Sequence, residues 1–553
     1  MQVVTWTAFL VTLIVAPWSA YDPINVPKLA VIAIGGFSSA GFLVANPSIF
    51  KDSRYRCFNL IAGLFILDLL VVLFFSSNNF DKGFFGTFGR STGFVAYVSL
   101  ALLFLGATVG SSKLAMQKFS IVLLLAGLLS SIYGVFQSIN IDPFNWSNPY
   151  SPVIGFLGNP NFQSSFLGFS GITAFAYVLS SDTKRTYRFA GIIYLAITTY
   201  VIKETDSQQG LLVLLGGIGI VLLIWIPTSR IAWLKLPSII TGIFVTLIVT
   251  IGSLNKGPLA TILYKPSVTY RGDYWRAGWK MTIDHPFTGI GLDSYGDWYR
   301  RARTIEATVR RGPDLTSNSA HNVFLDLSSN GGFPLLLIYL ALLSCVLRAI
   351  IKILKRSTNF DAPIVGLISV WFAYLAQSVI SINQLGLATW GWIISGLIIG
   401  YEITTCNSEM LSEVNKWKQK SKISKDTTNS KVSAKTFISV LCGIVVGALI
   451  GLPPLIASSK YLSALKSFDP KVVEQSASLW PYDSNRMGQV AVFLANNGRQ
   501  KEALDITSAG VNRFPDDYEL WRITSELSVA TSDQKFEALT QMKRLDPHNP
   551  NLK

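Results

Sequence analysis

The stretch SNSAHNVFLDLSSNGGFPLLLIYLALL, from Ser317 to Leu343, changes character halfway along its length. Its first half is polar and contains His321, one of only three histidines in 553 residues. Its second half begins an apolar run long enough to enter a membrane. The stretch therefore predicts a membrane-spanning helix that follows a polar loop carrying a histidine.

The same apolar character recurs along the whole chain. Half of the residues are hydrophobic and 14% are charged, whereas about a quarter of the residues of a soluble protein are charged. Apolar stretches of about 17 to 25 residues, the length that crosses a bilayer, follow one another. We therefore expect an all-α polytopic membrane protein with about thirteen transmembrane helices. The first stretch lacks a basic leader and a small-residue cleavage site, so we expect it to be retained. The expected spans lie near residues 4–20, 29–46, 58–76, 92–110, 119–138, 162–180, 187–203, 210–227, 232–252, 333–351, 362–382, 386–403 and 436–457.

The net charge of +15 follows a topological pattern. If the N-terminus is cytoplasmic, basic loops such as KDSRYR and RAIIKILKR fall inside, and the short outer loops are nearly free of Lys and Arg. That asymmetry is the positive-inside rule. The excess of positive charge is thereby explained, and we expect no nucleic-acid partner.

This topology divides the chain into parts. We expect a membrane domain (1–403) with a large outer-face loop (253–332), a cytoplasmic basic linker (404–435), a last transmembrane helix (436–457) and an extracytoplasmic helical tail (458–553). In the tail, GRQKEALDITSAGVNRFPDD and FEALTQMKRLDPHNP resemble the second helix and closing turn of tetratricopeptide repeats. Three interpretations of the tail stay open: it docks a protein partner, it caps the membrane domain, or it has no binding role.

The sequence contains no cofactor or metal motif. The four cysteines lie in or beside apolar runs without C-x-x-C spacing, which indicates neither a disulfide framework nor a zinc site. Walker A, G-x-G-x-x-G and H-E-x-x-H motifs are absent, and the outer-loop aspartates form no recognisable ligand cluster. We expect neither a metal nor a cofactor, and the sequence does not support a nucleotide-driven pump.

His321 is a candidate base. An imidazole has a pKa of about 6.5, so a neutral histidine can accept a proton at physiological pH. At the membrane boundary it could deprotonate a hydroxyl acceptor. The alternative is a helix-end histidine that bonds to Asn322 or to the backbone.

Candidate anion ligands lie in YRGDYWRAGWKMTIDHPFTGIGLDSY, which begins at Tyr270. Arg271 and Arg276 are one to two turns apart on a predicted helix, with Trp275 between them, and His285 lies in the following Pro- and Gly-rich turn. Guanidinium groups bind phosphate through two hydrogen bonds and stay charged when partly buried. The alternative is an interfacial amphipathic helix with snorkelling arginines.

Two further outer segments carry candidates. Arg90, in FFGTFGRSTGF, could hold an anion or could anchor the end of a span. In GFLGNPNFQSSF the amides of Asn159 and Asn161 could bind carbohydrate hydroxyls, although Asn159 could equally cap the following helix.

The order of FGR, YGVFQ, GFLGNPNF, RGDYWRAGWKMTIDHPFTGIGLDSY and SAHNVFLDLSSNGGFP resembles the O-antigen ligase and polymerase superfamily, which includes bacterial protein O-oligosaccharyltransferases. The resemblance covers roughly residues 55–400. It implies a protein of the bacterial inner membrane that transfers a glycan from undecaprenyl diphosphate to an acceptor hydroxyl on the outer face, without a metal ion. The acceptor would be lipid A core, a second lipid-linked glycan or a protein side chain.

The resemblance also implies residue roles. His321 corresponds to the family's base, Arg271 to an arginine that binds the diphosphate, and Arg90 to a first-loop arginine; Arg276 is a further candidate ligand of the diphosphate. The candidate glycan or acceptor contacts are Asn159, Asn161, Trp275, His285, Asn322 and Gln208.

One departure from the family pattern concerns donor binding. Family members often carry Ser-Arg-Gly at the outer start of a mid-chain span, whereas ETDSQQGLLVL has Gln208 or Gln209 in place of the arginine. Glutamine donates a hydrogen bond but brings no charge. Either Lys203 or another loop arginine compensates, or the donor is bound differently.

Two alternatives belong to other functional classes. A secondary transporter is compatible with many spans, but the sequence shows no paired inverted halves and few ionisable groups at mid-membrane, Asp68 being the main one. The other is a catalytically inactive scaffold whose tail is the working part.

Overall fold

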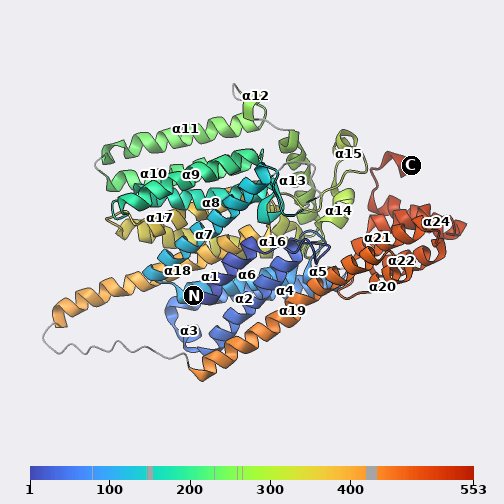
Figure 1. Cartoon of the computed structure of the whole chain (residues 1–553), viewed down its shortest axis with the longest axis horizontal. Coiled ribbons are helices and arrows are strands. Elements are labelled where there is room, and N and C mark those ends of the chain that lie inside the picture. Colours follow the sequence, from blue (N-terminus) through green and yellow to red (C-terminus); the bar gives the residue numbers. More distant parts are fainter. Residues whose placement is uncertain are drawn as a thin grey trace.

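The fold is helical throughout the described part of the chain. The computed structural model describes residues 1–77, 79–144, 146, 153–229, 231–257, 260–263, 266–418 and 433–552, and every regular element among them is a helix (Figure 1). The expected all-α class is therefore confirmed. The elements before the outer loop are α1 (Gln2–Leu13), α2 (Asn25–Ala45), α3 (Ser48–Lys51), α4 (Ser53–Phe75), α5 (Phe80–Phe85), α6 (Phe94–Gly110), α7 (Lys113–Ser138), η1 (Gly155–Leu157), α8 (Pro160–Leu179), α9 (Arg185–Glu204), α10 (Gln208–Trp225), η2 (Ile226–Thr228), η3 (Ala232–Leu234) and α11 (Lys235–Ser253).

The remaining elements form the outer loop, the last helices of the bundle and the tail. The loop contains α12 (Ala260–Leu263), α13 (Pro266–Asp284), α14 (Tyr295–Ala302) and α15 (Ile305–Arg311). The bundle continues with α16 (Val323–Arg356), α17 (Ala362–Ile380), α18 (Leu385–Lys418) and α19 (Ala434–Ser467). The tail adds α20 (Pro470–Ser476), α21 (Ser484–Asn496), α22 (Gln500–Arg513), α23 (Tyr518–Glu526), α24 (Ser532–Leu545) and η4 (Pro550–Leu552).

Ten helical segments of the described residues are long and apolar enough to cross a membrane. The other three expected spans are also helices. Two of them, α1 and α6, have 12 and 17 residues, and α9 has 20 residues but is not among the helices that meet both criteria. Length and composition therefore confirm a multi-span protein, and they do not confirm the count of thirteen.

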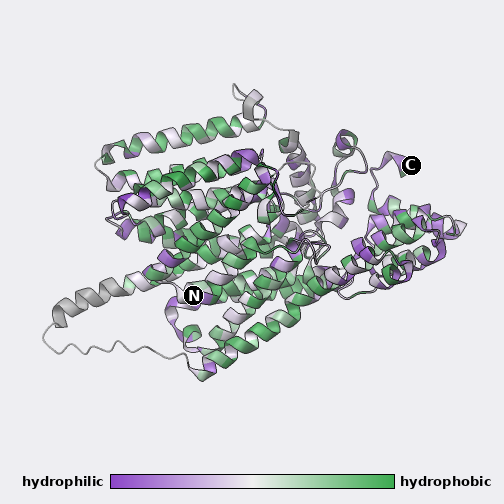
Figure 2. Ribbon diagram, in the orientation of Figure 1, coloured by the Kyte–Doolittle hydropathy of each residue, from purple (hydrophilic) through white to green (hydrophobic). Residues whose placement is uncertain are grey.

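The outer loop and the tail lie at the same end of the bundle. In Figure 1 the N-terminus, the far end of α18 and the start of α19 lie toward the left, whereas α13 to α15 and α20 to α24 lie toward the right. Figure 2 shows hydrophobic residues concentrated on the bundle helices and hydrophilic residues more abundant in the tail. The loop and the tail therefore share one end of the bundle, as the charge pattern predicts.

A buried lysine holds the end of α1. Lys28 lies on α2, and its Nζ donates hydrogen bonds to the carbonyl oxygens of Val11 (2.7 Å), Thr12 (3.3 Å) and Ile14 (3.0 Å). The last carbonyls of a helix have no partner within the helix and attract a cation. This charge inside the bundle is therefore used to cap a helix.

Helix α19 packs against α2 at very short range. A Cβ added at Gly443 would lie 2.2 Å from the carbonyl oxygen of Phe37, and one at Gly447 would lie 2.6 Å from that of Ala33. Small residues four apart allow such backbone contact between membrane helices. The close fit anchors the helix that leads to the tail.

Two expected boundaries fall differently in the structure. Helix α19 continues to Ser467 and does not end at residue 457, so the last span and the start of the tail are one helix. Helix α18 continues to Lys418, and residues 419–432 of the expected basic linker lie outside the described residues.

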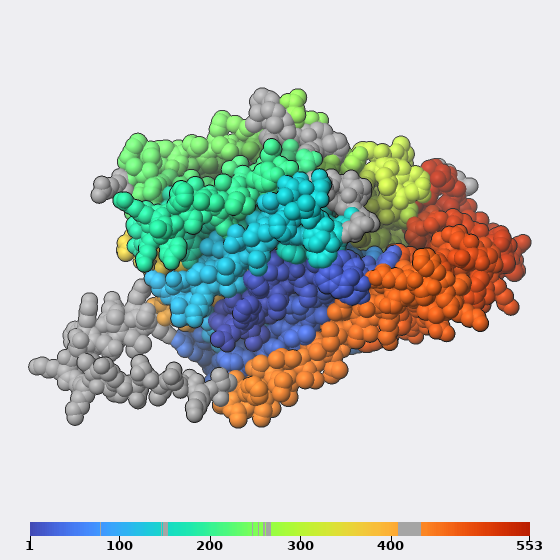
Figure 3. Space-filling view, in the orientation of Figure 1, coloured from blue at the N-terminus to red at the C-terminus, as the bar shows by residue number. Residues whose placement is uncertain are grey.

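The tail is a small helical domain with its own apolar core. Helices α21 and α22, and α23 and α24, pack as neighbours around buried side chains that include Val490, Leu494, Ala538 and Leu545. Figure 3 shows this domain packed against one end of the membrane domain. The resemblance to tetratricopeptide repeats stays a prediction.

Candidate functional site

His321 lies in a tight turn immediately before α16. Its φ is +52°, a left-handed conformation that is uncommon for residues other than glycine. The Ser319 hydroxyl accepts the His321 backbone N–H (2.8 Å) and donates to Asp326 (2.8 Å). Asn322 caps α16, because its side-chain oxygen accepts the N–H groups of Phe324 (3.0 Å) and Leu325 (3.1 Å). The turn is therefore fixed on both sides of the histidine.

The imidazole of His321 faces α13. It stacks on the ring of Tyr274 with 5.3 Å between ring centroids and an interplanar angle of 25°. Burial, followed by the positive charges of Arg271, Arg90 and Arg311, lowers its pKa from 6.5 to about 4. A lowered histidine pKa means that the imidazole is neutral at neutral pH and can accept a proton. The three guanidinium groups thus act electrostatically on the imidazole.

Arg90 is buried between two carboxylates. Its Nε lies 3.4 Å from Oδ1 of Asp293, its Nη2 lies 3.6 Å from Oδ2 of Asp326, and its Nη1 donates to the carbonyl of Asn318. Burial alone would lower the pKa of Arg90, but the charges of Asp293 and Asp326 raise it, and the balance lies above its ordinary value. Arg90 is thus a neutralised cation that holds the backbone three residues before His321.

The loop around Arg90 is folded over Asp293. The Thr87 N–H donates to this carboxylate (2.7 Å), and the Thr92 hydroxyl donates to it as well (2.9 Å). Asp293 therefore joins the first outer loop to the turn that follows α13. No local motif indicates this role, because the bonded residues are about two hundred positions apart along the chain.

Arg271 and Arg276 both lie on α13, but in different environments. Arg276 is exposed and lies 3.7 Å from Asp273, which also binds Arg310 at 2.7 Å. Arg271 is half-buried and has no acidic partner among the described residues. Burial lowers the pKa of Arg271 below its ordinary value. Its positive charge is therefore uncompensated beside His321.

Arg311 is a second uncompensated cation in the same place. It ends α15, its Nη1 donates to the Tyr274 hydroxyl, and its guanidinium lies 4.7 Å from the Tyr270 ring and 5.1 Å from the Tyr274 ring. Within the described part of the chain no carboxylate forms an ion pair with it. Arg311 was not predicted from the sequence, where only its proximity to SAHN in the same loop could have indicated it.

The turn HPFTGIG docks on a break in α16. Gly332 has a φ of +71° inside the helix, and a Cβ there would lie 2.6 Å from the Pro286 carbonyl oxygen. That carbonyl accepts the N–H of Phe333 (2.8 Å), and the Gly291 N–H donates to the carbonyl of Asn330 (3.1 Å). Backbone contact explains why a Gly-rich turn and a Gly-rich helix break occur together. Since α13 precedes this turn and His321 precedes α16, the contact fixes the two relative to each other.

Two other candidates lie near this turn. His285 contacts the edge of the Trp298 ring, with centroids 4.8 Å apart, at the end of α13. Trp275 lies on α13 and has a buried indole N–H without a hydrogen-bond partner among the described residues. The expected role of His285 and Trp275 in glycan binding stays a prediction.

The Asn-Pro-Asn candidates lie at the junction of α8 and α10. Asn159 caps α8 by accepting the N–H of Asn161 (2.9 Å), and the side-chain oxygen of Asn161 accepts the Ser207 hydroxyl (2.7 Å). Gln208 is the first residue of α10. The bond between Asn161 and Ser207 joins the starts of the two helices, and these hydrogen bonds of Asn159 and Asn161 do not run to His321 or Arg271.

The tail contacts the outer loop through buried ion pairs. Arg303 lies 2.6 Å and Arg300 3.3 Å from Oδ2 of Asp546, which follows α24. Both arginines also donate to the carbonyl of Pro313 (2.9 and 2.8 Å), and Arg303 donates to that of Leu315 (3.2 Å). The Asp546 side chain is fully buried. One carboxylate of the tail therefore supports the segment that leads to His321.

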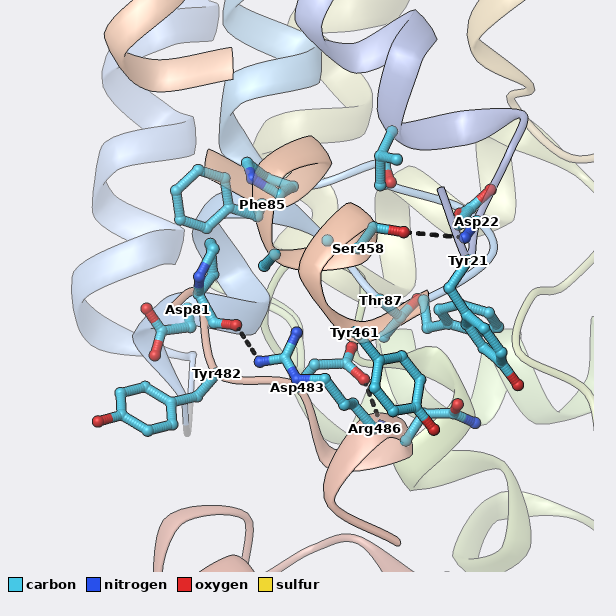
Figure 4. Close-up of a pocket in the computed structure, with 18 residues that line it drawn as sticks. Tyr21, Asp22, Asp81, Phe85, Thr87, Ser458, Tyr461, Tyr482, Asp483 and Arg486 are labelled. Atoms are coloured by element: carbon cyan, nitrogen blue, oxygen red, sulfur yellow. Dashed lines mark hydrogen bonds between the residues drawn. The ribbon is translucent and has the colours of Figure 1, made fainter. Parts of the chain in front are cut away.

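A cavity with an empty volume of about 600 Å³, part of it open to solvent, lies between the tail and the membrane domain (Figure 4). Its walls include the rings of Tyr21 and Tyr461, which meet edge to face with their centroids 4.7 Å apart and their planes at 62°. The dashed bonds in Figure 4 include the one from the Asp22 N–H to the Ser458 hydroxyl (2.9 Å). Neither His321 nor Arg271 lines this cavity, so it belongs to the joint between the two domains.

The family comparison agrees with this geometry. Residues 193–340 match the sequence model of a family described as O-antigen ligase. The matched segment includes α13, the outer loop and the turn with His321. This part of the chain is therefore similar to the O-antigen ligase family, which confirms the resemblance to the O-antigen ligase and polymerase superfamily. The domain indicates glycosyl transfer at a membrane. The search of curated proteins found no match to the chain.

Proposed function

We propose that this protein transfers a glycan from an undecaprenyl-diphosphate donor to an acceptor hydroxyl on the outer face of the bacterial inner membrane. One observation carries the proposal: a neutral histidine lies beside two arginines that no carboxylate of the described chain neutralises. A base next to uncompensated positive charge suits a reaction that removes a proton and releases an anion.

The proposed reaction needs two groups acting at once. His321 accepts the proton of the acceptor hydroxyl while the hydroxyl oxygen bonds to the anomeric carbon of the donor glycan. The bond from that carbon to the diphosphate oxygen breaks, and undecaprenyl diphosphate leaves with the electron pair. Arg271 and Arg311 stabilise the departing charge by charge-assisted hydrogen bonds. The histidine then returns its proton to solvent.

Donor binding would also make His321 a stronger base. In the free protein its pKa is lowered to about 4. Burial is the main cause, and the positive charges of Arg271 and Arg311 contribute. A bound diphosphate would neutralise both guanidinium groups, and the pKa of His321 would rise toward the range where bases are most effective at neutral pH. The base is therefore activated when the donor is in place.

The other arginines receive different roles. Arg311 is the loop arginine that would compensate for Gln208 or Gln209 in the mid-chain position. Arg90 is assigned to positioning, because its guanidinium is already bound by Asp293 and Asp326. Arg276 is exposed and faces Asp273, so its part in diphosphate binding would be secondary.

The tail is proposed to position the catalytic turn. Asp546 binds Arg300 and Arg303, which in turn bind the carbonyls of residues 313 and 315. The Ser317 hydroxyl donates to the Ser319 carbonyl (2.8 Å), and Ser319 fixes His321. Of the three interpretations of the tail, this favours a cap on the membrane domain. The acceptor stays within the expected classes: lipid A core, a second lipid-linked glycan, or a protein side chain in the alternative of an O-oligosaccharyltransferase.

The proposal is tested with purified protein, an undecaprenyl-diphosphate glycan and each acceptor class. We expect transfer by the wild type, and its loss in His321→Ala and Arg271→Ala with folding retained. The matched control is Lys280→Ala, an exposed residue on the same helix that pairs with Asp284. Full transfer by His321→Ala, or substrate flux across proteoliposomes without any glycan transfer, would overturn the proposal.

A further inference from the structure

A second large cavity lies at the end of the bundle opposite to the His321 turn. It has an empty volume of about 1450 Å³, part of it open to solvent. Its lining comes from the ends of α10 and α16, the starts of α7, α11 and α17, and the middle of α18. Helix α16 begins beside His321 and ends here, and its 34 residues correspond to roughly 50 Å. The cavity is therefore remote from the proposed catalytic site.

The membrane helices give this cavity apolar walls. Side chains from α10, α16 and α17 line it. They are Leu223, Ile224, Ile353, Leu354, Ile364 and Val365. An apolar recess between membrane helices has no water to fill it favourably and is suited to hydrocarbon.

The same cavity has a cationic rim. Lys113 lies 3.0 Å from Asp361, Arg356 lies 2.7 Å from Glu402, and Lys235 has no acidic partner among the described residues. Thr228 and Thr358 add hydroxyl groups to the lining. Three cations from three different helices and one carboxylate, Asp361, thus line the cavity, while Glu402 behind Arg356 also pairs with Lys352 at 3.2 Å, which leaves a net positive charge.

We infer that this cavity binds an anionic phospholipid. The headgroup phosphate would bind Lys235, with Lys113 and Arg356 around it, and the acyl chains would lie along the apolar walls. Basic pockets between membrane helices on the cytoplasmic side are the kind of site that anionic headgroups occupy. This end also carries the N-terminus and the basic loops, so the charge pattern places it in the inner leaflet (Figure 1).

The chemistry distinguishes this ligand from two others. A zwitterionic lipid would fit the apolar walls but would bring no net charge to the rim. Free phosphate would fit the rim but would leave the walls uncovered. The inference does not rest on the proposed glycan transfer, because no residue is shared by the two sites.

The test is native mass spectrometry of the full-length protein in detergent. Wild type is titrated with phosphatidylglycerol, with phosphatidylcholine and with inorganic phosphate. We expect a retained phosphatidylglycerol adduct, whose affinity falls about tenfold or more in Lys113→Gln/Lys235→Gln because charged hydrogen bonds are lost. The matched control, Lys184→Gln, removes an exposed cation outside the lining and should keep the adduct.

Three results would overturn the inference: equal adducts with phosphatidylcholine, unchanged phosphatidylglycerol binding in the double variant, or phosphate binding as tightly as the lipid. The last would identify a simple anion site. Glycan transfer is measured in parallel, so that a failed lipid site is not confused with a failed catalytic site.

Discussion

The arginines around the His321 turn fall into two groups that look alike in the sequence. Arg90, Arg300 and Arg303 are buried and bound to carboxylates of Asp293, Asp326 or Asp546. Neither Arg271 nor Arg311 pairs with an acidic residue of the described chain, and Arg311 lies over the rings of Tyr270 and Tyr274. The first group holds the backbone, and the second leaves positive charge uncompensated at the imidazole.

The difference separates structural cations from ligand-binding ones. A buried ion pair is already satisfied, and removing one partner strands a charge in a poorly solvated place. An uncompensated, half-buried arginine is poised for an anion that arrives from outside. Neutralisation by acidic neighbours therefore predicts what each arginine does when it is removed.

The largest contrast is expected in stability. Arg90→Gln leaves Asp293 and Asp326 without their cation and should lower the free energy of unfolding by about 3–5 kcal/mol. Arg271→Gln removes a charge that has no acidic partner and should change stability little. Thermal unfolding of both variants in the same detergent measures the contrast. Equal stability of the two would break the division into groups.

The next contrast is between neighbours in the chain. Arg311→Gln should raise the KM for the lipid-linked donor about ten- to hundredfold, since a charged hydrogen bond contributes about 1.5–3 kcal/mol. Arg310→Gln is the matched control, because Arg310 is bound to Asp273 at 2.7 Å. Initial rates at varied donor concentration give both values. A similar KM in the two variants would count against the assignment of Arg311.

A smaller effect is expected from the tail. Asp546→Asn weakens the hold on Arg300 and Arg303, and the resulting displacement of the turn should lower kcat about tenfold. The donor KM should stay the same, because the uncompensated arginines are untouched. Glu519→Gln is the control, since this residue is an exposed partner of Arg300 at 3.0 Å. A raised donor KM with unchanged kcat would contradict a positioning role.

The smallest effect is a shift in pH dependence. The pKa of His321 is lowered to about 4, so kcat/KM should persist well below pH 6.5 and fall only as His321 becomes protonated. Arg271→Gln keeps a hydrogen-bond donor, unlike Arg271→Ala, and should therefore retain a residual rate; because it removes one of the charges that lower the pKa of His321, the acidic limb of that residual rate should move to higher pH. For the wild type the acidic limb of kcat should lie above that of kcat/KM, because the bound donor neutralises the arginines.

Rates from about pH 4 to 8 measure both limbs. Recovery of full activity after return to neutral pH excludes acid unfolding as the cause. An acidic limb that Arg271→Gln leaves in place would show that this arginine does not act on the histidine.

Much of the fold follows from local properties of the chain. The length and hydropathy of each apolar run predict helices, and all thirteen expected segments are helical, although ten meet the length and hydropathy criteria for a span. Charge in the loops predicts that the outer loop and tail share a face. Helix ends were predicted less accurately, because α19 continues to Ser467 and passes its expected end at residue 457.

The site was predictable only in part. Unusual residues in short motifs pointed to His321 and Arg271. Ion pairing across hundreds of residues has no local signature, so Arg90 and Arg271 could not be told apart. The same holds for Asp546, which follows α24 and yet binds α14.

The central claim is that Arg271 and Arg311 form the binding site for the diphosphate beside His321. It is tested most directly by titrating undecaprenyl diphosphate into the inactive His321→Ala protein and into the same protein with Arg271→Gln and Arg311→Gln. We predict binding to the first and a loss of about a hundredfold or more in affinity in the second. Unchanged affinity in the triple variant would contradict the account.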